Sequence, residues 1–414
     1  MDNLNSSAAL TEPPTVASYE LELDPHTLFR RLRPLTPFIR SEDGCYLAIR
    51  AAEVERLATD PRTRQMEVEF IATRGVTAGP LFEFAKHSML LSNGPAHRRR
   101  RAPLSRAFAV KLISELRPQI RLVADRLIDE CLARGGMNFI AGYCAQIPAR
   151  TIASMLGLPA ADIPEFTRHV YSLARMLKTS FASDMVSEMQ DSARHLTQYV
   201  DDIWKDRSKH PRDDLLTSYL EKLGEPAGPS RAEALSQVVT VILAGSDTTR
   251  TALAIQLSLL LQHPAQWQAV CGSSQLIAGA VMESLRYEPS VSSIPRFTIE
   301  DIEVDGRVVP SNSILRLSTM SAMRDPARYD RPDEFDITRS DWVRPHPVFG
   351  AGVHRCLGEA LAKVELEEGL AALATRLPEL ELVGEPPRVH GGGGIRGIAE
   401  CRLQRHASSW QLRA

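Results

Sequence analysis

The stretch Phe349–Glu365, F-G-A-G-V-H-R-C-L-G-E-A-L-A-K-V-E, decides the fold that we expect for this chain. Two prolines, Pro345 and Pro347, exclude a helix just upstream, whereas the residues after Gly358 favour one, so the stretch predicts a loop that leads into a helix. A cysteine at such a helix N-terminus lies among unpaired backbone N–H groups and at the positive end of the helix dipole. Both features favour the thiolate, which makes Cys356 a candidate metal ligand.

Three other interpretations of this loop are weaker. A free cysteine is often only a small buried apolar residue. A dinucleotide-binding loop needs a third glycine and a strand leading into it, and G-A-G-V-H-R has neither. A zinc site needs a second Cys or His at the spacing of zinc ligands, and none stands on either side. The full pattern, F-x-G-x-x-x-C-x-G, instead combines an aromatic residue, glycines and a cysteine in one register.

This register resembles the haem-binding loop of the cytochrome P450 family of haem-thiolate monooxygenases. The resemblance implies the cytochrome P450 fold, which is mainly α with a small β subdomain, and a haem b cofactor (iron protoporphyrin IX). It makes Cys356 the proximal iron ligand, with Phe349 beside it and the N–H groups of Leu357 and Gly358 directed at the sulfur. His354, two residues before the cysteine, matches a residue that binds a haem propionate.

The longest predicted helix starts at Ser230, which forms a capping box with Glu233, and continues to about Gln262. Its middle reads L-A-G-S-D-T-T, and a glycine and two threonines oppose helix propensity there. Threonine hydroxyls can bond back to a carbonyl one turn earlier and open the helix. Taken alone, the segment is equally consistent with a kink or a helix-packing notch.

The same A-G-S-D-T segment resembles the oxygen-activating groove of the family, in which the glycine lets O2 approach the backbone. By that resemblance Ala244 contacts the haem, Thr248 supports oxygen binding and Asp247 relays protons. The reaction needs this pair because protons must reach the distal oxygen atom without bulk water entering the site.

A third matching segment is N-G-P-A-H-R-R-R-R-A-P, in which His97 and Arg101 share one helix face. They resemble the family's propionate-binding pair, as Arg296 resembles its strand arginine. The neighbouring arginines form either a solvated or nucleic-acid-binding patch or a docking surface for an acidic electron donor; they are Arg98, Arg99, Arg100 and Arg106.

The sequence also predicts a structural ion pair. Glu283 and Arg286 stand three residues apart on a helix, and apolar neighbours indicate that they are buried. E-x-x-R at this distance before the cysteine resembles the core Glu–Arg pair of the family. Glu334 occupies a place where relatives often have Arg or His, which leaves open whether Glu334 or Arg339 completes the network.

Four apolar residues are candidates for substrate contact by their family position, which implies a hydrophobic small molecule; they are Leu90, Val291, Ile294 and Ile395. Three histidines, His169, His195 and His210, stand in a run of amphipathic helices. They have no matched partners in the sequence, so we expect them to be surface or satisfied core residues.

Composition sets further bounds. The chain has 414 residues, a formal net charge of −2 and six cysteines without a repeating spacing, which favours a reducing compartment and gives no reason to expect nucleic-acid binding. The N-terminal residues are polar and show neither the basic nor the apolar region typical of a signal peptide, and the most apolar run, Val238–Leu261, is interrupted by Asp247 and Arg250. We expect a cytoplasmic monomer without membrane contact, with a disordered leader over residues 1–17 and a single haem-thiolate domain over residues 18–414.

The resemblance implies a monooxygenase that inserts one oxygen atom of O2 into a C–H or C=C bond. No flavin or ferredoxin module is recognisable in the sequence, so we expect electrons from a separate ferredoxin and its reductase. Two alternatives share the cysteine loop: a peroxide-driven haem-thiolate peroxygenase, and a haem-based binding or sensor protein. The intact pair Asp247–Thr248 argues against the first, because peroxygenases of this kind replace it.

Overall fold

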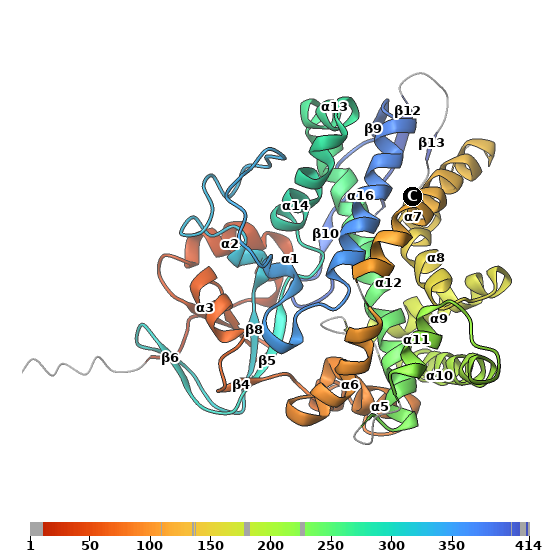
Figure 1. Ribbon diagram of the computed structural model, residues 1–414. Coiled ribbons are helices and arrows are strands. Elements are labelled where there is room, and N and C mark those ends of the chain that lie inside the picture. The colour runs from red at the N-terminus through yellow and green to blue at the C-terminus, as the bar shows by residue number, and fades with distance from the viewer. Residues whose placement is uncertain are drawn as a thin grey trace, which may run out of the picture.

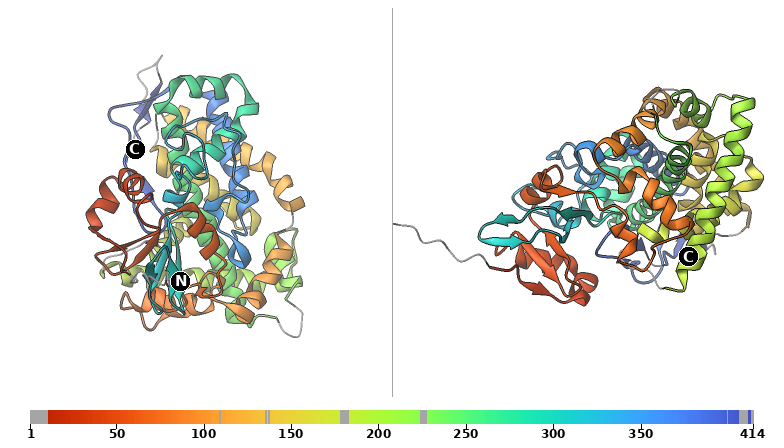
Figure 2. Two further views of the ribbon diagram at one scale, coloured as in Figure 1. Left: turned by 90° about the vertical axis from the view of Figure 1, so that its left-hand side faces the viewer. Right: turned by 90° about the horizontal axis from the view of Figure 1, so that it is seen from below.

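The computed structural model describes residues 11–108, 110–134, 136, 138–177, 183–223, 228–398, 400–405 and 411–412. Most of these residues lie in helices, and the largest sheet lies at one side of the helical part (Figures 1 and 2). The predicted fold class, mainly α with a small β part, is therefore confirmed.

The long helices form the body of the molecule in Figure 1; they are α6 (Gly94–Ala107), α7 (Val110–Arg134), α8 (Gln146–Met155), α9 (Ile163–Ala174), α10 (Met185–Lys209), α12 (Arg231–Gln262), α14 (Ile277–Tyr287) and α16 (Glu359–Arg376). The shorter helices are α1 (Ser18–Leu23), α2 (Pro25–Leu32), α3 (Ala51–Leu57), α4 (Glu69–Ala72), α5 (Pro80–His87), α11 (Leu215–Glu221), α13 (Pro264–Gly272) and α15 (Thr319–Ala322). Single turns are η1 (Met89–Leu91), η2 (Ile140–Cys144), η3 (Ala160–Asp162), η4 (Arg175–Leu177), η5 (Ser274–Leu276), η6 (Pro347–Phe349) and η7 (Gly352–His354).

The largest sheet has six strands in the order β1-β2-β3-β8-β5-β4; they are β1 (Thr15–Val16), β2 (Phe38–Ser41), β3 (Tyr46–Ala48), β8 (Ile314–Leu317), β5 (Ile294–Thr298) and β4 (Thr63–Arg64). The smaller sheets are formed by β6 (Ile302–Val304) with β7 (Arg307–Val309), β10 (Val389–His390) with β11 (Gly397–Ile398), and β9 (Leu380–Leu382), β12 (Leu403–Arg405) and β13 (Gln411–Leu412). In the large sheet β5 runs antiparallel to β8; it begins at Ile294, beside the cysteine loop, and includes Arg296.

α12 is the core of the helical part, and it has the bounds that the capping box predicts. Ser230 accepts a hydrogen bond from the Glu233 amide, and Glu233 closes the box. Among the described residues, α12 is the one helix long and apolar enough to cross a membrane, but 78% of its most apolar 18 residues are buried inside the protein. A helix that is apolar on all sides belongs in a protein core when other helices surround it.

Residues 18–32 form two helices, because Pro25 begins a new helix and the Asp24 side chain caps it by accepting from the Thr27 amide. The glycine-containing stretch 60–94 contains β4, α4, α5 and η1. One prediction needs correction. The predicted leader is partly ordered: residues 1–10 lie outside the described residues, but β1 pairs with β2 in parallel. A single domain over residues 18–414 stays a prediction.

Candidate functional site

The cysteine loop is a tight turn between η6 and α16. Gly350 and Gly352 have φ values of 70° and 63°, in the left-handed region that favours glycine. A Cβ on Gly352 would also lie 2.7 Å from Thr59 Cγ2. The Cys356 amide donates to the Phe349 carbonyl at 2.8 Å and closes the loop. The backbone thus fixes the cysteine immediately before α16, as the glycine spacing predicts.

The Cys356 thiol faces inward. Its side chain is exposed, yet the surrounding protein desolvates the sulfur enough to raise its pKa, so the exposed side opens onto space within the molecule. The Gly358 amide and Arg101 favour the thiolate, but burial outweighs them. The helix N-terminus thus contributes in the predicted direction, but it does not outweigh burial. A metal ion bound to the sulfur would favour the thiolate further.

Four basic side chains gather beside this loop. The His97 and His354 rings lie 4.0 Å apart between centroids, and Arg101 donates to the Arg355 carbonyl at 2.5 Å. Arg296, from β5, donates to Gln65 at 2.6 Å and to the Ala58 carbonyl at 3.0 Å. Elements far apart in the sequence, α6, β5 and η7, thus bring together His97, Arg101, Arg296 and His354.

The charge of this cluster is uncompensated. Burial lowers the pKa of Arg296 to about 10, and burial together with the neighbouring cations lowers the pKa of His97 to about 4 and of His354 to about 3. Within the described part of the chain no carboxylate pairs with Arg101 or Arg296, and His97 Nε2 is buried without a hydrogen-bond partner. Buried cations without counter-charges are costly. The cluster therefore fits a ligand that carries carboxylates, as protoporphyrin does.

The middle of α12 stays a regular helix. The Thr248 hydroxyl donates to the Ala244 carbonyl at 3.0 Å, yet the helix continues unbroken to Gln262. A Cβ on Gly245 would lie 3.0 Å from Ile152 Cδ1 of α8. That close approach supports the packing-notch interpretation of the glycine, because the space beside its Cα belongs to α8.

Asp247 connects the interior to the surface. Its side chain is buried and forms an ion pair with Arg250, one turn later on α12. The Arg250 guanidinium lies 4.5 Å from the centroid of the Tyr171 ring of α9. Arg250 and Tyr171 both line an open groove of about 500 Å³ at the protein surface. One side chain therefore separates the Asp247 carboxylate from solvent.

One acidic residue of this region was not predicted. Glu365 on α16 is fully buried, its Oε1 has no hydrogen-bond partner in the described part of the chain, and burial raises its pKa to about 8. The Thr151 and Thr249 hydroxyls oppose this shift only in part. In the sequence, Glu365 stands on the apolar side of a helix, which could have indicated burial. The nearby Glu367 and Glu368 instead suggest a charged helix face.

Two of the four predicted substrate residues lie beside α12 or the cysteine loop, and the other two pair with each other. Leu90 lies in η1, which Gln237 of α12 fixes by accepting from the Met89 amide at 2.7 Å. Val291 and Ile395 form an isolated antiparallel bridge with each other. A Cβ on Gly350 would lie 3.6 Å from Ile294 Cδ1, which places Ile294 beside the loop.

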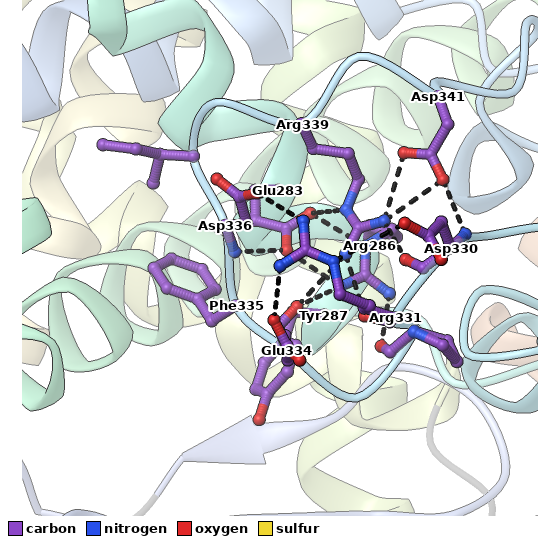
Figure 3. Close-up of polar contacts among 12 residues, drawn as sticks. Glu283, Arg286, Tyr287, Asp330, Arg331, Glu334, Phe335, Asp336, Arg339 and Asp341 are labelled. Carbon is purple, nitrogen blue, oxygen red and sulfur yellow. Dashed lines mark hydrogen bonds and ion pairs between the residues drawn. The ribbon is translucent and has the colours of Figure 1, made fainter.

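The Glu283–Arg286 pair is completely buried, and Figure 3 shows its surroundings. Arg286 donates to both carboxylate oxygens of Glu283 at 2.8 Å. Arg339 Nε lies 3.3 Å from Glu283 Oε2, whereas the Glu334 carboxylate turns outward to Arg331. Arg339 is therefore the third charged member of the network. Glu334 contributes only its backbone carbonyl, which accepts from Arg286 at 3.0 Å.

The predicted docking arginines do not form one free surface. Arg99 and Arg100 both pair with Glu233, at 2.5 and 2.9 Å, and Arg100 is buried. Arg106 donates to the Lys222 carbonyl at 3.4 Å. The docking prediction is wrong for Arg100, which is buried, and it stays a prediction for the other arginines.

Comparison with known proteins agrees with this geometry. The family model described as "Cytochrome P450" matches residues 160–271 and 275–381. The chain is 46% identical to the plant-inducible cytochrome P450-pinF1 of Rhizobium radiobacter, over 95% of this chain and 93% of that one. It is 33% identical to mycinamicin IV hydroxylase/epoxidase of Micromonospora griseorubida, over 72% and 75%. The crystal structure of CalO2 has a TM-score of 0.85 at 31% identity and covers 92% of this chain and 96% of its own. The chain therefore belongs to the cytochrome P450 family and is an oxidoreductase, a monooxygenase with a haem cofactor.

Proposed function

We propose that this protein inserts one oxygen atom from O2 into a hydrophobic small molecule, using haem b and electrons from a separate ferredoxin and its reductase. The observation that supports it best is the uncompensated basic cluster beside Cys356, with Asp247 and Thr248 on α12. This arrangement combines a haem cradle with a proton-delivering pair, and a protein that only binds or senses haem has no use for the pair.

The residues of the cradle fit haem b. Cys356 would ligate the iron, and Arg101, Arg296, His97 and His354 would hold the propionates, whose charge would neutralise that of the two buried arginines. Phe349, Gly358 and Ala244 would contact the haem in this proposal, and the Gly358 amide, which favours the thiolate, would tune the sulfur. Haem held by a thiolate activates O2 and favours cleavage of its O–O bond.

The side chains of α12 deliver protons. The Thr248 hydroxyl, now bonded to the Ala244 carbonyl, can rotate to donate to the reacting oxygen. Asp247 replaces that proton when Arg250 moves out toward the groove that it lines. Glu365, which is protonated at neutral pH, is a second internal acid next to Thr249. Protons thus cross a dry interior one side chain at a time.

Leu90, Val291, Ile294 and Ile395 form the walls against which an apolar substrate packs in this proposal. All four are partly buried, so each leaves apolar surface for contact. We also propose a cytoplasmic monomer, which a soluble electron donor can reach. Arg98 is exposed on α6, and in this proposal its positive charge attracts an acidic electron donor.

The decisive experiment is the spectrum of the reduced, haem-loaded protein with carbon monoxide. We expect the red-shifted Soret band that thiolate ligation gives, and a protein without this band contradicts the assignment of Cys356. Product formation is then compared with NADH and a ferredoxin system, and with peroxide alone. Efficient turnover with peroxide and none with the ferredoxin system would contradict the monooxygenase proposal.

A further inference from the structure

Two helices on the side of the molecule hold a group of potential metal ligands. α9 and α10 pack side by side (Figure 1). His169 of α9 and His195 of α10 stack with ring centroids 3.9 Å apart and an interplanar angle of 22°. Glu165 lies one turn before His169 on α9. One ligand atom from each of the three lies within 4.8 Å of the other two, and no second group of this kind occurs in the described residues. His169 is a hydrogen-bonded core residue and His210 is exposed, as expected, but the structure also pairs His169 with His195, which the sequence did not indicate.

The protonation of His169 can be deduced from its neighbours. Arg168 Nη2 lies 3.0 Å from His169 Nε2, and a guanidinium can only donate. Nε2 therefore carries the lone pair, and Nδ1–H donates to Ser192 Oγ at 3.1 Å. A neutral imidazole oriented through its other nitrogen is the form that binds metals.

Arg168 stands where a metal ion would bind. Its Nη2 lies 3.0 Å from His169 Nε2 and 3.6 Å from Glu165 Oε1, which are themselves 3.8 Å apart. Ligand atoms that are each about 2.1 Å from one tetrahedral ion lie about 3.4 Å apart, so this pair needs little movement. The Arg168 and Glu165 side chains are 63% and 62% exposed, so both can move.

We propose that Glu165, His169 and His195 form a binding site for a divalent transition-metal ion of the zinc type that joins α9 to α10. Imidazole and carboxylate donors select such ions over Ca²⁺ and Mg²⁺, which prefer oxygen ligands. Three protein ligands leave one position for water. Arg168 occupies the site when no ion is bound and is displaced by the ion.

A bound ion would link α9 to α10, and both of these helices pack on α12. A ligand that binds only the packed arrangement stabilises it by mass action. The ion therefore slows the separation of α9 from α10, and backbone amides in both helices exchange more slowly with solvent when it is bound.

The test is a calorimetric titration of Zn²⁺ into the full-length, haem-loaded protein after removal of metals with a chelator. We expect one ion per chain. His195→Ala and Glu165→Gln should each weaken binding by at least about a hundredfold, since loss of a ligand exceeds the 10–100-fold cost of losing an outer partner. Arg168→Gln should tighten binding several-fold by removing the competitor. His210→Ala, at an exposed position after α10, is the control and should bind like the wild type.

Hydrogen exchange gives a second measurement. Zn²⁺ should slow exchange in α9 and α10 of the wild type and leave it unchanged in His195→Ala. The haem absorption and far-UV circular dichroism spectra of each variant check its fold. Absence of saturable binding, or equal affinity in His195→Ala and the wild type, would overturn the site. Equal affinity in Arg168→Gln and the wild type would overturn the competition between arginine and ion.

Discussion

Glu365→Gln tests whether a buried, neutral acid lies behind the proton-delivering pair. Glu365 is 1% exposed, and burial raises its pKa from the ordinary 4.5 to about 8. Between these two values the native protein holds one proton more than the unfolded chain. The free energy of unfolding therefore falls as the pH rises through this window, and the contribution of this carboxyl to stability is fully present only below about 4.5.

The size of the effect follows from the same interval. One proton changes stability by about 1.4 kcal/mol per pH unit, so the interval from 4.5 to about 8 corresponds to at most about 5 kcal/mol. Glutamine has nearly the same shape and does not ionise. The stability of Glu365→Gln relative to the wild type should therefore increase with pH, by about 3 kcal/mol between pH 5.5 and 7.5.

Equilibrium urea unfolding, followed by far-UV circular dichroism at several pH values, measures this difference. Glu367→Gln is the matched control, because Glu367 lies on the same helix and its carboxylate pairs with Arg117 at 2.5 Å near the surface. A stability difference between Glu365→Gln and the wild type that stays constant across this pH range would refute the assignment of a neutral buried acid. The same rising difference in the control would show that the effect belongs to the charge of α16.

Three further predictions concern the site and its support. Cys356→Ala should retain little haem and lose activity, as pyridine haemochrome content and product formation will show; normal turnover contradicts the ligand role. Thr248→Ala should still consume NADH but release peroxide, so that product per NADH falls by about a hundredfold, the lower range for positioned proton-transfer groups; tight coupling in this variant contradicts the role. In urea unfolding, Arg286→Met should lower the free energy of unfolding by about 3–5 kcal/mol, because it leaves Glu283 buried without its main partner. Arg339→Met should lower it less, because Arg286 still pairs with Glu283, and Glu334→Gln should leave it almost unchanged. Any other order contradicts the assignment of Arg339 to the network.

Local signals predicted much of this structure because they act within one or two turns. The capping box of Ser230 and Glu233 fixes the start of α12, and Gly350 and Gly352 adopt the positive φ values that a tight loop needs. Pro25 shows the limit of such reasoning, since the same residue type can end a helix or begin one. Its neighbour Asp24, as a helix cap, decides between the two.

The roles that escaped sequence reasoning depend on neighbours from distant parts of the chain. From the sequence alone Arg99 and Arg100 form a basic surface run, but Glu233, more than one hundred residues later, pairs with both and Arg100 is buried. The thiol of Cys356 has the helix terminus that favours a thiolate, yet desolvation by the fold reverses the balance.

The arginines around the haem cradle differ in whether a carboxylate pairs with them. Glu233 pairs with Arg99 and Arg100 outside the cradle, whereas in the described part of the chain no carboxylate pairs with Arg101 or Arg296 inside it. Buried positive charge therefore remains where a cofactor with two carboxylates fits. Burial meanwhile keeps His97 and His354 neutral, with pKa values of about 4 and 3, until such a ligand arrives. Because buried uncompensated cations are costly, the same residues that hold the cofactor should destabilise the protein without it. Haem-free protein should therefore gain stability when Arg296 is replaced by Gln, whereas the haem-loaded protein should lose it, and thermal unfolding of both forms distinguishes this from a merely structural role of the strand.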